Sequence, residues 1–216
     1  MNVYFISGLG ADKRAFKKIK LPDEFNPIHI EWIRPEKSET LRDYALLLSL
    51  SIDQSQPFVL LGLSLGGIMV TEMAKVLKPE KAIIISSTWN SAQLPWYFKL
   101  IGKWQLHNII PLQLLQWSRK GRTLIFGTRT NEEKELISQI LKDTDMYFLS
   151  WSINAVLHWK NEEKPPHLLH IHGTNDHVFP IRVLQPDISI VGGEHFMIFS
   201  KAEQINEILE KELGNL

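Results

Sequence analysis

The pentapeptide Gly62-Leu63-Ser64-Leu65-Gly66 and its flanks constrain the fold more than any other stretch. Residues 58–61 before it form a continuous apolar run, which predicts a strand buried on both faces. From 68 to 77 after it, apolar residues recur at helical spacing until Pro79. A chain that turns from strand to helix so abruptly strains the apex residue and needs glycines to avoid steric overlap. The pattern predicts that Ser64 stands clear of the backbone at the positive end of a helix; the structural alternative is a turn that merely lets a helix pack on a sheet.

The chain before residue 89 alternates short apolar runs with signals for helix starts. Thr40-Leu41-Arg42-Asp43 fits a capping box, and Asp12 is a second helix-capping side chain, expected to open a helix through 15–19. The expected strands are residues 3–6, 28–33, 58–61 and 82–85. This β-α-β-α-β-α-β order predicts an α/β fold: a parallel sheet with right-handed crossovers and helices on both faces.

The alternation stops at Trp89 and resumes after Pro165-Pro166. The interval has helical signals, and the expected helices are 95–105, 111–117, 133–141 (opened by a capping box at 130–133) and 145–159. It also contains six of the seven tryptophans, at positions 89, 96, 104, 117, 151 and 159. We expect a helical cap over about 89–164, inserted into a single domain of 1–216. Most of these tryptophan rings should pack the cap against the core of the sheet domain. Trp89, Trp151 and Phe196 are instead expected to line a substrate pocket.

Two further strands, at 168–172 and 188–191, complete a sheet of six. Ser200-Lys201-Ala202-Glu203 is expected to cap a last helix that stops at Gly214. In an open parallel sheet, chemistry collects at the carboxyl ends of the strands. Ser64 follows the third strand, Asp176 the fifth and His195 the sixth. Serine, then acid, then histidine is the order expected when the serine lies on a strand-to-helix turn.

These residue types suggest nucleophilic catalysis. A serine hydroxyl is a weak nucleophile, so Ser64 needs His195 as general base, and His195 needs the Asp176 carboxylate to fix its tautomer. The N–H groups of Leu65, directly after the nucleophile, and of Leu9, in the glycine-flanked loop after the first strand, are the expected donors to an oxyanion. Each residue also has a structural interpretation, because Asp176 suits an Asx turn and His195 is one of eight histidines.

Three motifs carry a resemblance to a known family: 62–67 (GLSLGG), 173–176 (GTND) and 193–196 (GEHF). With the strand order of 1–88 and 165–216, they make the chain similar to the α/β-hydrolases, and 195–200 resembles the methylesterase and hydroxynitrile-lyase branch. The resemblance implies a three-layer fold with a mainly parallel six-stranded sheet and a Ser64-His195-Asp176 triad. Two features depart from the family: Ser7-Gly8 stands where His-Gly is common, and the usual first two strands are missing.

Composition excludes several classes of protein. Lysine plus arginine balance aspartate plus glutamate at 24 each, so no net field favours nucleic acid or an anionic membrane. The absence of cysteine rules out disulfides, thiolate metal sites and a cysteine nucleophile. No apolar run approaches a membrane span, and the opening MNVYFISG lacks the features of a secretory signal, so we expect a cytoplasmic protein. The oligomeric state stays open.

Three interpretations from other classes compete. Gly8 and Gly10 suggest a dinucleotide site with Glu31 on the ribose, but Lys13 stands at the third glycine position. A metal hydrolase would use histidines and one carboxylate near the fifth strand: His167, His170, His172, Asp176 and His177. A non-catalytic ligand-binding module on the same fold is the third.

The motifs together predict a serine hydrolase that cleaves a small to medium, largely apolar carboxylic ester through an acyl-enzyme, without cofactor or metal. A small uncharged substrate is favoured because a dry aromatic pocket does not compensate for the desolvation of a charged one. Thioester hydrolysis, carbon–carbon bond hydrolysis and a hydroxynitrile-lyase-like reaction on the same three residues stay open.

Overall fold

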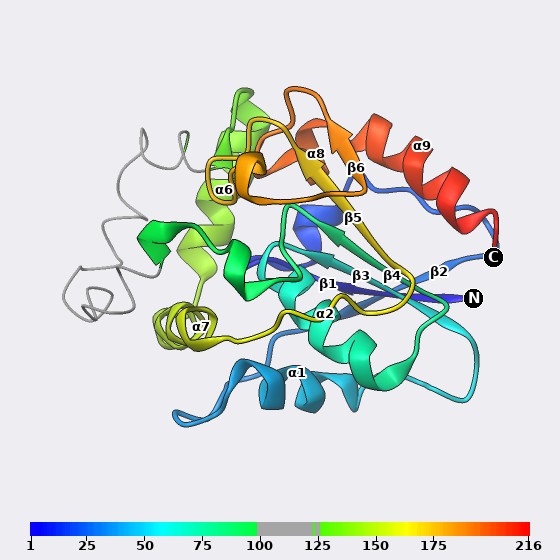
Figure 1. Ribbon diagram of the computed structural model, residues 1–216. Coiled ribbons are helices and arrows are strands. Elements are labelled where there is room, and N and C mark those ends of the chain that lie inside the picture. The colour runs from blue at the N-terminus through cyan, green and yellow to red at the C-terminus, as the bar shows by residue number, and fades with distance from the viewer. Residues whose placement is uncertain (99–122, 124–125) are drawn as a thin grey trace.

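A parallel six-stranded sheet forms the centre of the molecule (Figure 1). The computed structural model describes residues 1–98, 123 and 126–216. The strands are β1 (Asn2–Ile6), β2 (Asn26–Ile30), β3 (Phe58–Leu63), β4 (Lys81–Ile85), β5 (Leu168–Gly173) and β6 (Ile188–Ile190). They lie in the order β2-β1-β3-β4-β5-β6, and every neighbouring pair is parallel. The predicted sheet of six parallel strands is confirmed.

Alternate residues of each central strand enter two separate apolar cores. In β1, Tyr4 and Ile6 belong to the core on one face of the sheet, and Val3 and Phe5 to the core on the other. The same alternation occurs in β3 and β4. Because both faces are covered, the central strands are continuously apolar, as in other fully buried parallel sheets.

Helices cover both faces. On one side, α1 (Leu41–Ser49) and α2 (Leu65–Leu77) pack together, and α2 lies against β3 and β4. On the other lie η1 (Lys13–Phe16), α8 (Met197–Ser200) and α9 (Ala202–Leu213). Figure 1 shows α9 and the α1–α2 pair on opposite sides of the sheet. Helices α6 (Asn131–Asp143) and α7 (Met146–His158), together with the short η2 (Ser91–Gln93), belong to the segment between β4 and β5; η4 (Ile181–Val183) precedes β6.

Three predicted capping side chains are confirmed, although one of them caps a shorter helix than expected, and a fourth predicted cap is wrong. The side chains of Asp12, Thr40 and Thr130 accept the expected backbone hydrogen bonds, and Thr130 forms a full capping box. Asp12, however, caps only the short 3-10 helix η1, whereas the sequence predicted a helix through 15–19. The predicted Ser200 cap is wrong because Ser200 ends α8, and its hydroxyl contacts the Phe196 carbonyl instead.

The described part of the predicted cap segment (89–164) includes α6 and α7, which lie at the carboxyl ends of the strands (Figure 1). The predicted helices at 133–141 and 145–159 correspond to α6 and α7. The predictions at 111–117 and at most of 95–105, including Trp104 and Trp117, lie outside the described residues. Within the described ranges, no helix has the length and apolar character that crossing a bilayer requires.

Candidate active site

Ser64 lies at the apex of the turn between β3 and α2 in a backbone conformation that few side chains adopt, with φ of 51° and ψ of −116°. A Cβ atom at Gly62 would overlap the backbone carbonyl of Gly66, and one at Gly66 would overlap the carbonyl of Ile6. The two glycines are therefore what allows strand, turn and helix to approach so closely. The half-exposed Ser64 is left at the N-terminus of a 13-residue helix.

Three side chains from distant parts of the chain form one hydrogen-bonded line. The Ser64 hydroxyl lies 3.0 Å from His195 Nε2, and His195 Nδ1 lies 2.8 Å from Asp176 Oδ2. A carboxylate accepts only, so Nδ1 carries the proton and Nε2 is free to accept from the serine hydroxyl. The structure thus brings together the three residues that the sequence places after β3, β5 and β6. In this arrangement the imidazole can take the proton of Ser64.

The Asp176 carboxylate is almost fully buried and well supplied with donors. Its Oδ1 accepts from the backbone N–H groups of Val178, at 2.7 Å, and Phe179, at 2.9 Å. Burial by itself would raise the pKa of Asp176, but the charge and hydrogen bond of His195, the neighbouring His172 and the Phe179 N–H together lower it below its ordinary value. The carboxylate is therefore ionised at neutral pH, and it does form the Asx turn suggested by the sequence.

Two aromatic rings flank His195. The ring of Phe179 lies 5.9 Å from the imidazole centre and the ring of Phe126, from the cap segment, lies 6.2 Å from it. The Phe196 N–H donates to the Phe126 carbonyl, and Arg129 forms a 2.8 Å ion pair with Glu194. The cap segment thus holds the histidine loop on both sides of His195. Neither Phe126 nor Phe179 belongs to a recognisable motif, so sequence reasoning missed them.

The loop after β1 lies close to Ser64. A Cβ atom at Gly8 would lie 3.3 Å from the Ser64 Cβ, and Leu9 lines the same cavity as Ser64. Leu65 is the first residue of α2, where backbone N–H groups have no acceptor within the helix. The loop is anchored to the cap segment, since Thr144 donates to the Gly10 carbonyl at 3.1 Å.

An apolar cavity of about 180 Å³ opens onto Ser64 and His195. One wall comes from the loops of the sheet and the other from the inner faces of α6 and α7. Among the described residues, the second wall consists of Ile137, Ile140, Leu141, Thr144, Leu149 and Ile153, with Phe126 beside them. Their spacing along α6 and α7 is helical, and the sequence did show this pattern; only the packing decides that it faces a cavity.

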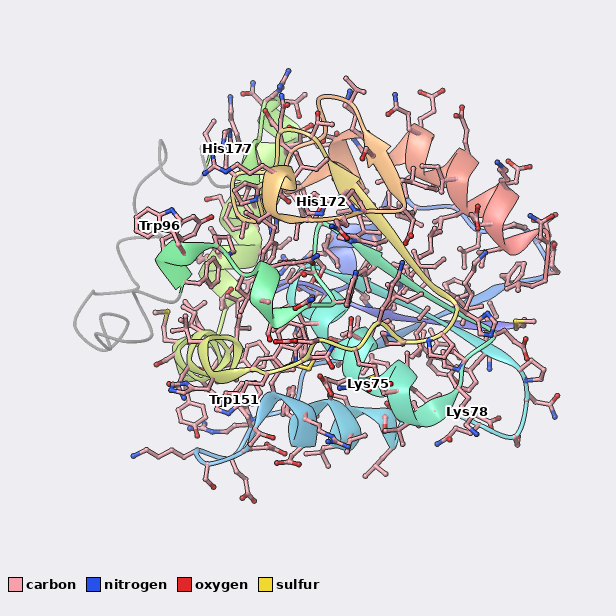
Figure 2. The ribbon with its side chains drawn as sticks, in the orientation of Figure 1. Lys75, Lys78, Trp96, Trp151, His172 and His177 are labelled. Atoms are coloured by element: carbon pink, nitrogen blue, oxygen red, sulfur yellow. The ribbon has the colours of Figure 1, made fainter. Side chains whose placement is uncertain are left out.

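The three aromatics predicted for the pocket have different positions. Phe196 lines the cavity. Trp151 does not: it is buried in the core beside Tyr44, with ring centres 4.5 Å apart, and donates to the Glu39 carbonyl (Figure 2). Trp89 packs half-buried against the same core, also away from the cavity lining. These two tryptophans pack the cap segment against the core, which is the role expected for most of the tryptophans in this segment.

The rival interpretations find little support in this geometry. The Gly8–Gly10 loop leads into a four-residue 3-10 helix, not the α-helix on which a pyrophosphate would rest. His167 and His177 are exposed, whereas His170 and His172 are fully buried. In the part of the chain that the structure describes, no three histidine or carboxylate side chains are grouped to hold a metal ion.

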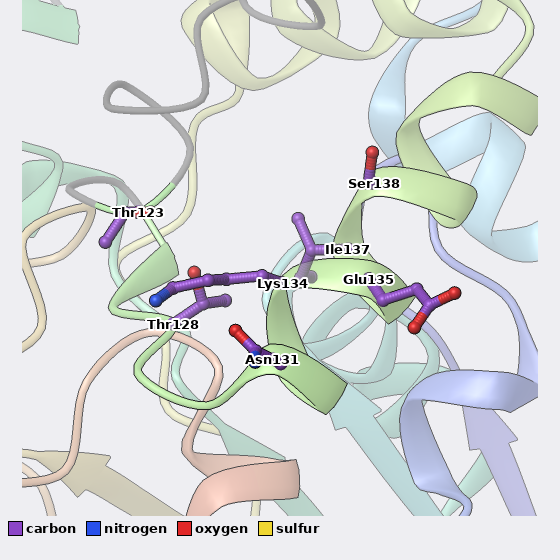
Figure 3. A pocket seen from close by; sticks show the side chains of 7 residues that line it. All are labelled: Thr123, Thr128, Asn131, Lys134, Glu135, Ile137 and Ser138. Carbon is purple, nitrogen blue, oxygen red and sulfur yellow. The ribbon is translucent and has the colours of Figure 1, made fainter.

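A second cavity, of about 400 Å³, lies along α6 (Figure 3). Its described lining is polar except for one side chain: Thr123, Thr128, Asn131, Lys134, Glu135, Ile137 and Ser138. Ile137 also belongs to the wall of the Ser64 cavity. Ile137 is the one described residue that the two cavities share, and the described lining of the polar cavity contains none of the three hydrogen-bonded residues.

Comparisons with known proteins agree with this architecture. Residues 3–208 match the family described as "Alpha/beta hydrolase family". No curated protein matches the chain.

Solved structures give the same fold. A lipase-esterase related protein from Clostridium acetobutylicum is 17% identical, with a TM-score of 0.68 over 96% of this chain and 92% of that one. An epoxide hydrolase from Bacillus megaterium is 12% identical, with a TM-score of 0.71 over 99% and 93%. The RedJ thioesterase of prodiginine biosynthesis in Streptomyces coelicolor is 14% identical, with a TM-score of 0.65 over 98% and 85%.

Proposed function

Because the chain belongs to the alpha/beta hydrolase family, we propose that it is a serine hydrolase that cleaves a small, largely apolar carboxylic ester through a Ser64-His195-Asp176 triad. The observation that carries the proposal is the line of hydrogen bonds from the Ser64 hydroxyl through His195 to the buried Asp176, at 3.0 and 2.8 Å, opening onto an apolar cavity. Nucleophile, base and orienting anion are then all supplied by this chain.

In the first half of the reaction, Ser64 Oγ attacks the carbonyl carbon as its proton passes to His195 Nε2. The carbonyl oxygen becomes an oxyanion, which the N–H groups of Leu65 and Leu9 stabilise together with the N-terminus of α2. The intermediate then collapses, the bond to the alcohol oxygen breaks, and Nε2 returns the proton to the leaving alcohol. Asp176 stays ionised throughout and stabilises the imidazolium.

In the second half, water attacks the acyl-enzyme. His195 takes a proton from that water, the Ser64 ester bond breaks, and the proton returns to Ser64 Oγ. Apart from the substrate and this water, both halves use groups of this chain. The cavity favours an uncharged acyl group, because its described lining is apolar apart from Ser64, His195 and Thr144.

The cavity also limits the size of the acyl group. An apolar cavity of roughly 150 Å³ accommodates a benzene ring, and this one measures about 180 Å³. We therefore expect short acyl esters, up to about the bulk of a benzoyl group, to be the best substrates. A thioester with the same acyl group would occupy the same cavity, so ester and thioester should be compared directly.

The test combines a fluorophosphonate probe with a panel of esters of increasing acyl length and matching thioesters. The wild-type protein should be labelled and should turn over the short esters. Ser64→Ala should abolish labelling, and both Ser64→Ala and His195→Ala should lower kcat by about three orders of magnitude or more, because triad members act as a unit. Ser55→Ala, at an exposed serine, is the control and should match wild type.

Near-normal ester turnover by Ser64→Ala or His195→Ala would contradict the mechanism. Specific binding of short apolar ligands with no labelling or turnover would favour a ligand-binding module instead. The boundaries of the cap segment and the cytoplasmic location stay predictions.

A further inference from the structure

Two fully buried histidines lie directly behind Asp176, on β5. His172 Nε2 is 2.8 Å from the Phe179 carbonyl oxygen and 3.5 Å from Asp176 Oδ2. His172 Nδ1 is in turn 3.2 Å from His170 Nε2. Figure 2 labels His172 beside β5 in the interior of the molecule. Neither histidine contacts Ser64 or His195, and the proposed reaction steps do not use them.

The hydrogen-bond partners determine where the protons lie. A carbonyl oxygen only accepts, so His172 Nε2 must carry a proton and donate it to Phe179. Burial lowers the pKa of His172, and burial together with His172 lowers that of His170 to about 3, so both rings are neutral. His172 Nδ1 therefore accepts, and His170 Nε2 donates to it. The Phe179 carbonyl thus fixes the tautomer of His172, and His170 matches it as a donor to Nδ1.

This tautomer links the turn that carries Asp176 to β5. The Phe179 N–H donates to Asp176 Oδ1, while the Phe179 carbonyl accepts from His172 on the strand. The same His172 Nε2 lies 3.5 Å from Asp176 Oδ2, the oxygen that accepts from His195. Asp176, Phe179 and His172 therefore contact one another in pairs, around the carboxylate that orients His195.

Simple core packing does not account for the pair. Two phenyl rings would fill the same space without burying the polar ring nitrogens of His170 and His172, both of which are fully buried. A polar pair of this kind, hydrogen-bonded within the core and placed against the buried carboxylate, indicates a role in holding it.

We infer that His172 is a positioning residue: its Nε2–H, donated to the Phe179 carbonyl, holds the Asp176–Phe179 turn so that the carboxylate meets His195 Nδ1. The inference rests on the proposed function, because Asp176 matters to the reaction only if His195 is the base. A small displacement of a catalytic group lowers rates strongly, by up to about 100-fold for 1 Å.

The principal test is His172→Phe, which keeps the ring and removes the N–H. The expected result is a 10- to 100-fold loss of kcat with KM within about twofold of wild type, since the substrate cavity is untouched. The downfield ¹H resonance of His195 Nδ1–H, hydrogen-bonded to carboxylate, should broaden or move upfield in the free protein. This resonance needs no substrate, so it tests the positioning role even if ester hydrolysis proves wrong.

Two further variants separate positioning from packing. His172→Gln places an amide N–H near the position of Nε2 and should recover most of kcat and the resonance, whereas the shorter His172→Asn should not. The matched control is His177→Phe, the same substitution on the exposed side of the turn, one residue from Asp176 (Figure 2). It should leave both readouts unchanged.

The inference is overturned if folded His172→Phe retains wild-type kcat and an unchanged resonance. If His172→Phe does not fold, the Gln and Asn variants decide, because equal kcat and equal spectra in the two would contradict a role for the N–H. A kcat loss in His177→Phe as large as that in His172→Phe would also contradict it, since the effect would then not depend on the buried contacts.

Discussion

At the scale of single residues, the strained backbone of Ser64 is held by its neighbours. The Ser64 N–H donates to the Ile85 carbonyl at 3.0 Å, and the Ser64 carbonyl accepts from the Ser87 hydroxyl at 2.7 Å and from the Gly67 N–H at 2.9 Å. A positive φ at a non-glycine residue costs of order 1–3 kcal/mol, and it persists only where surrounding contacts over-determine it. Here both backbone groups of the apex residue are satisfied.

Gly66→Ala tests this arrangement. The new Cβ would meet the Ile6 carbonyl, which belongs to a central strand and has little freedom to move. We expect a stability loss of about 1–3 kcal/mol, measured by urea unfolding, and a fluorophosphonate labelling rate at least tenfold slower, because α2 must shift away from β1.

The control for that variant is Gly214→Ala. It also brings a Cβ against a carbonyl, that of Glu210 at 2.8 Å, but at the end of α9, far from the cap segment (Figure 1). Its labelling rate should equal that of wild type. A Gly66→Ala protein labelled at the wild-type rate would show that the close approach of turn and strand is not needed.

At the scale of elements, α6 and α7 combine two tasks. Their inner faces pack toward the sheet and also provide the outer wall of the Ser64 cavity. Helix α6 is anchored at its start by the Thr130 capping box and at its end by Thr144, which contacts the loop of Gly10. Because the wall is helical, the side chains that limit the cavity are held at defined depths.

Ile153→Ala on α7 should therefore change acyl preference. Removing this half-buried side chain from the cavity wall makes room for a longer acyl chain. A methylene group in an apolar pocket is worth roughly 10- to 200-fold in kcat/KM, so the ratio of kcat/KM for an octanoyl over a butyryl ester should rise at least about tenfold. The ester panel measures the ratio.

Ile208→Ala, on α9 in the opposite core, is the matched control. It removes the same atoms from a partly buried position and should lower stability without altering the acyl ratio. An unchanged ratio in Ile153→Ala would mean that the acyl group does not occupy this cavity.

At the scale of the whole molecule, buried histidines make folding depend on pH. Burial lowers the pKa of both His170 and His172 in the native state, that of His170 to about 3, whereas an unfolded histidine titrates near 6.5. Between about pH 6.5 and the native pKa, the unfolded chain binds protons that the folded one does not. Stability must therefore rise with pH in this window and fall as pH drops below 6.5.

We expect the free energy of unfolding, measured by urea titration, to fall between pH 7 and pH 5, with about 2 kcal/mol of that loss due to His170 and a further loss due to His172. His170→Gln removes one titrating group and should reduce the pH dependence by about 2 kcal/mol. The exposed His177→Gln should leave it unchanged. A stability that is constant from pH 7 to pH 5 would contradict the neutral, buried pair.

Much of the fold and of the candidate site could be predicted because its signals are local. The glycines around Ser64, the continuous apolar strands and the cap of Thr130 each depend on a few adjacent residues. Predictions that needed non-local packing were less successful. Ser200 does not cap α9, Trp151 packs on Tyr44 and not in the cavity, and Asp12 opens only a short 3-10 helix.

The sequence by itself determined the sheet, the strand-to-helix turn at Ser64, and the order of serine, acid and histidine, because periodicity and steric demands are properties of neighbouring residues. The tertiary structure alone decided which apolar faces of α6 and α7 line a cavity and that His172 contacts the turn of Asp176. Those contacts join segments far apart in the chain or depend on a ring's direction within a strand. Their energy comes from burial and hydrogen-bond geometry that no local pattern encodes.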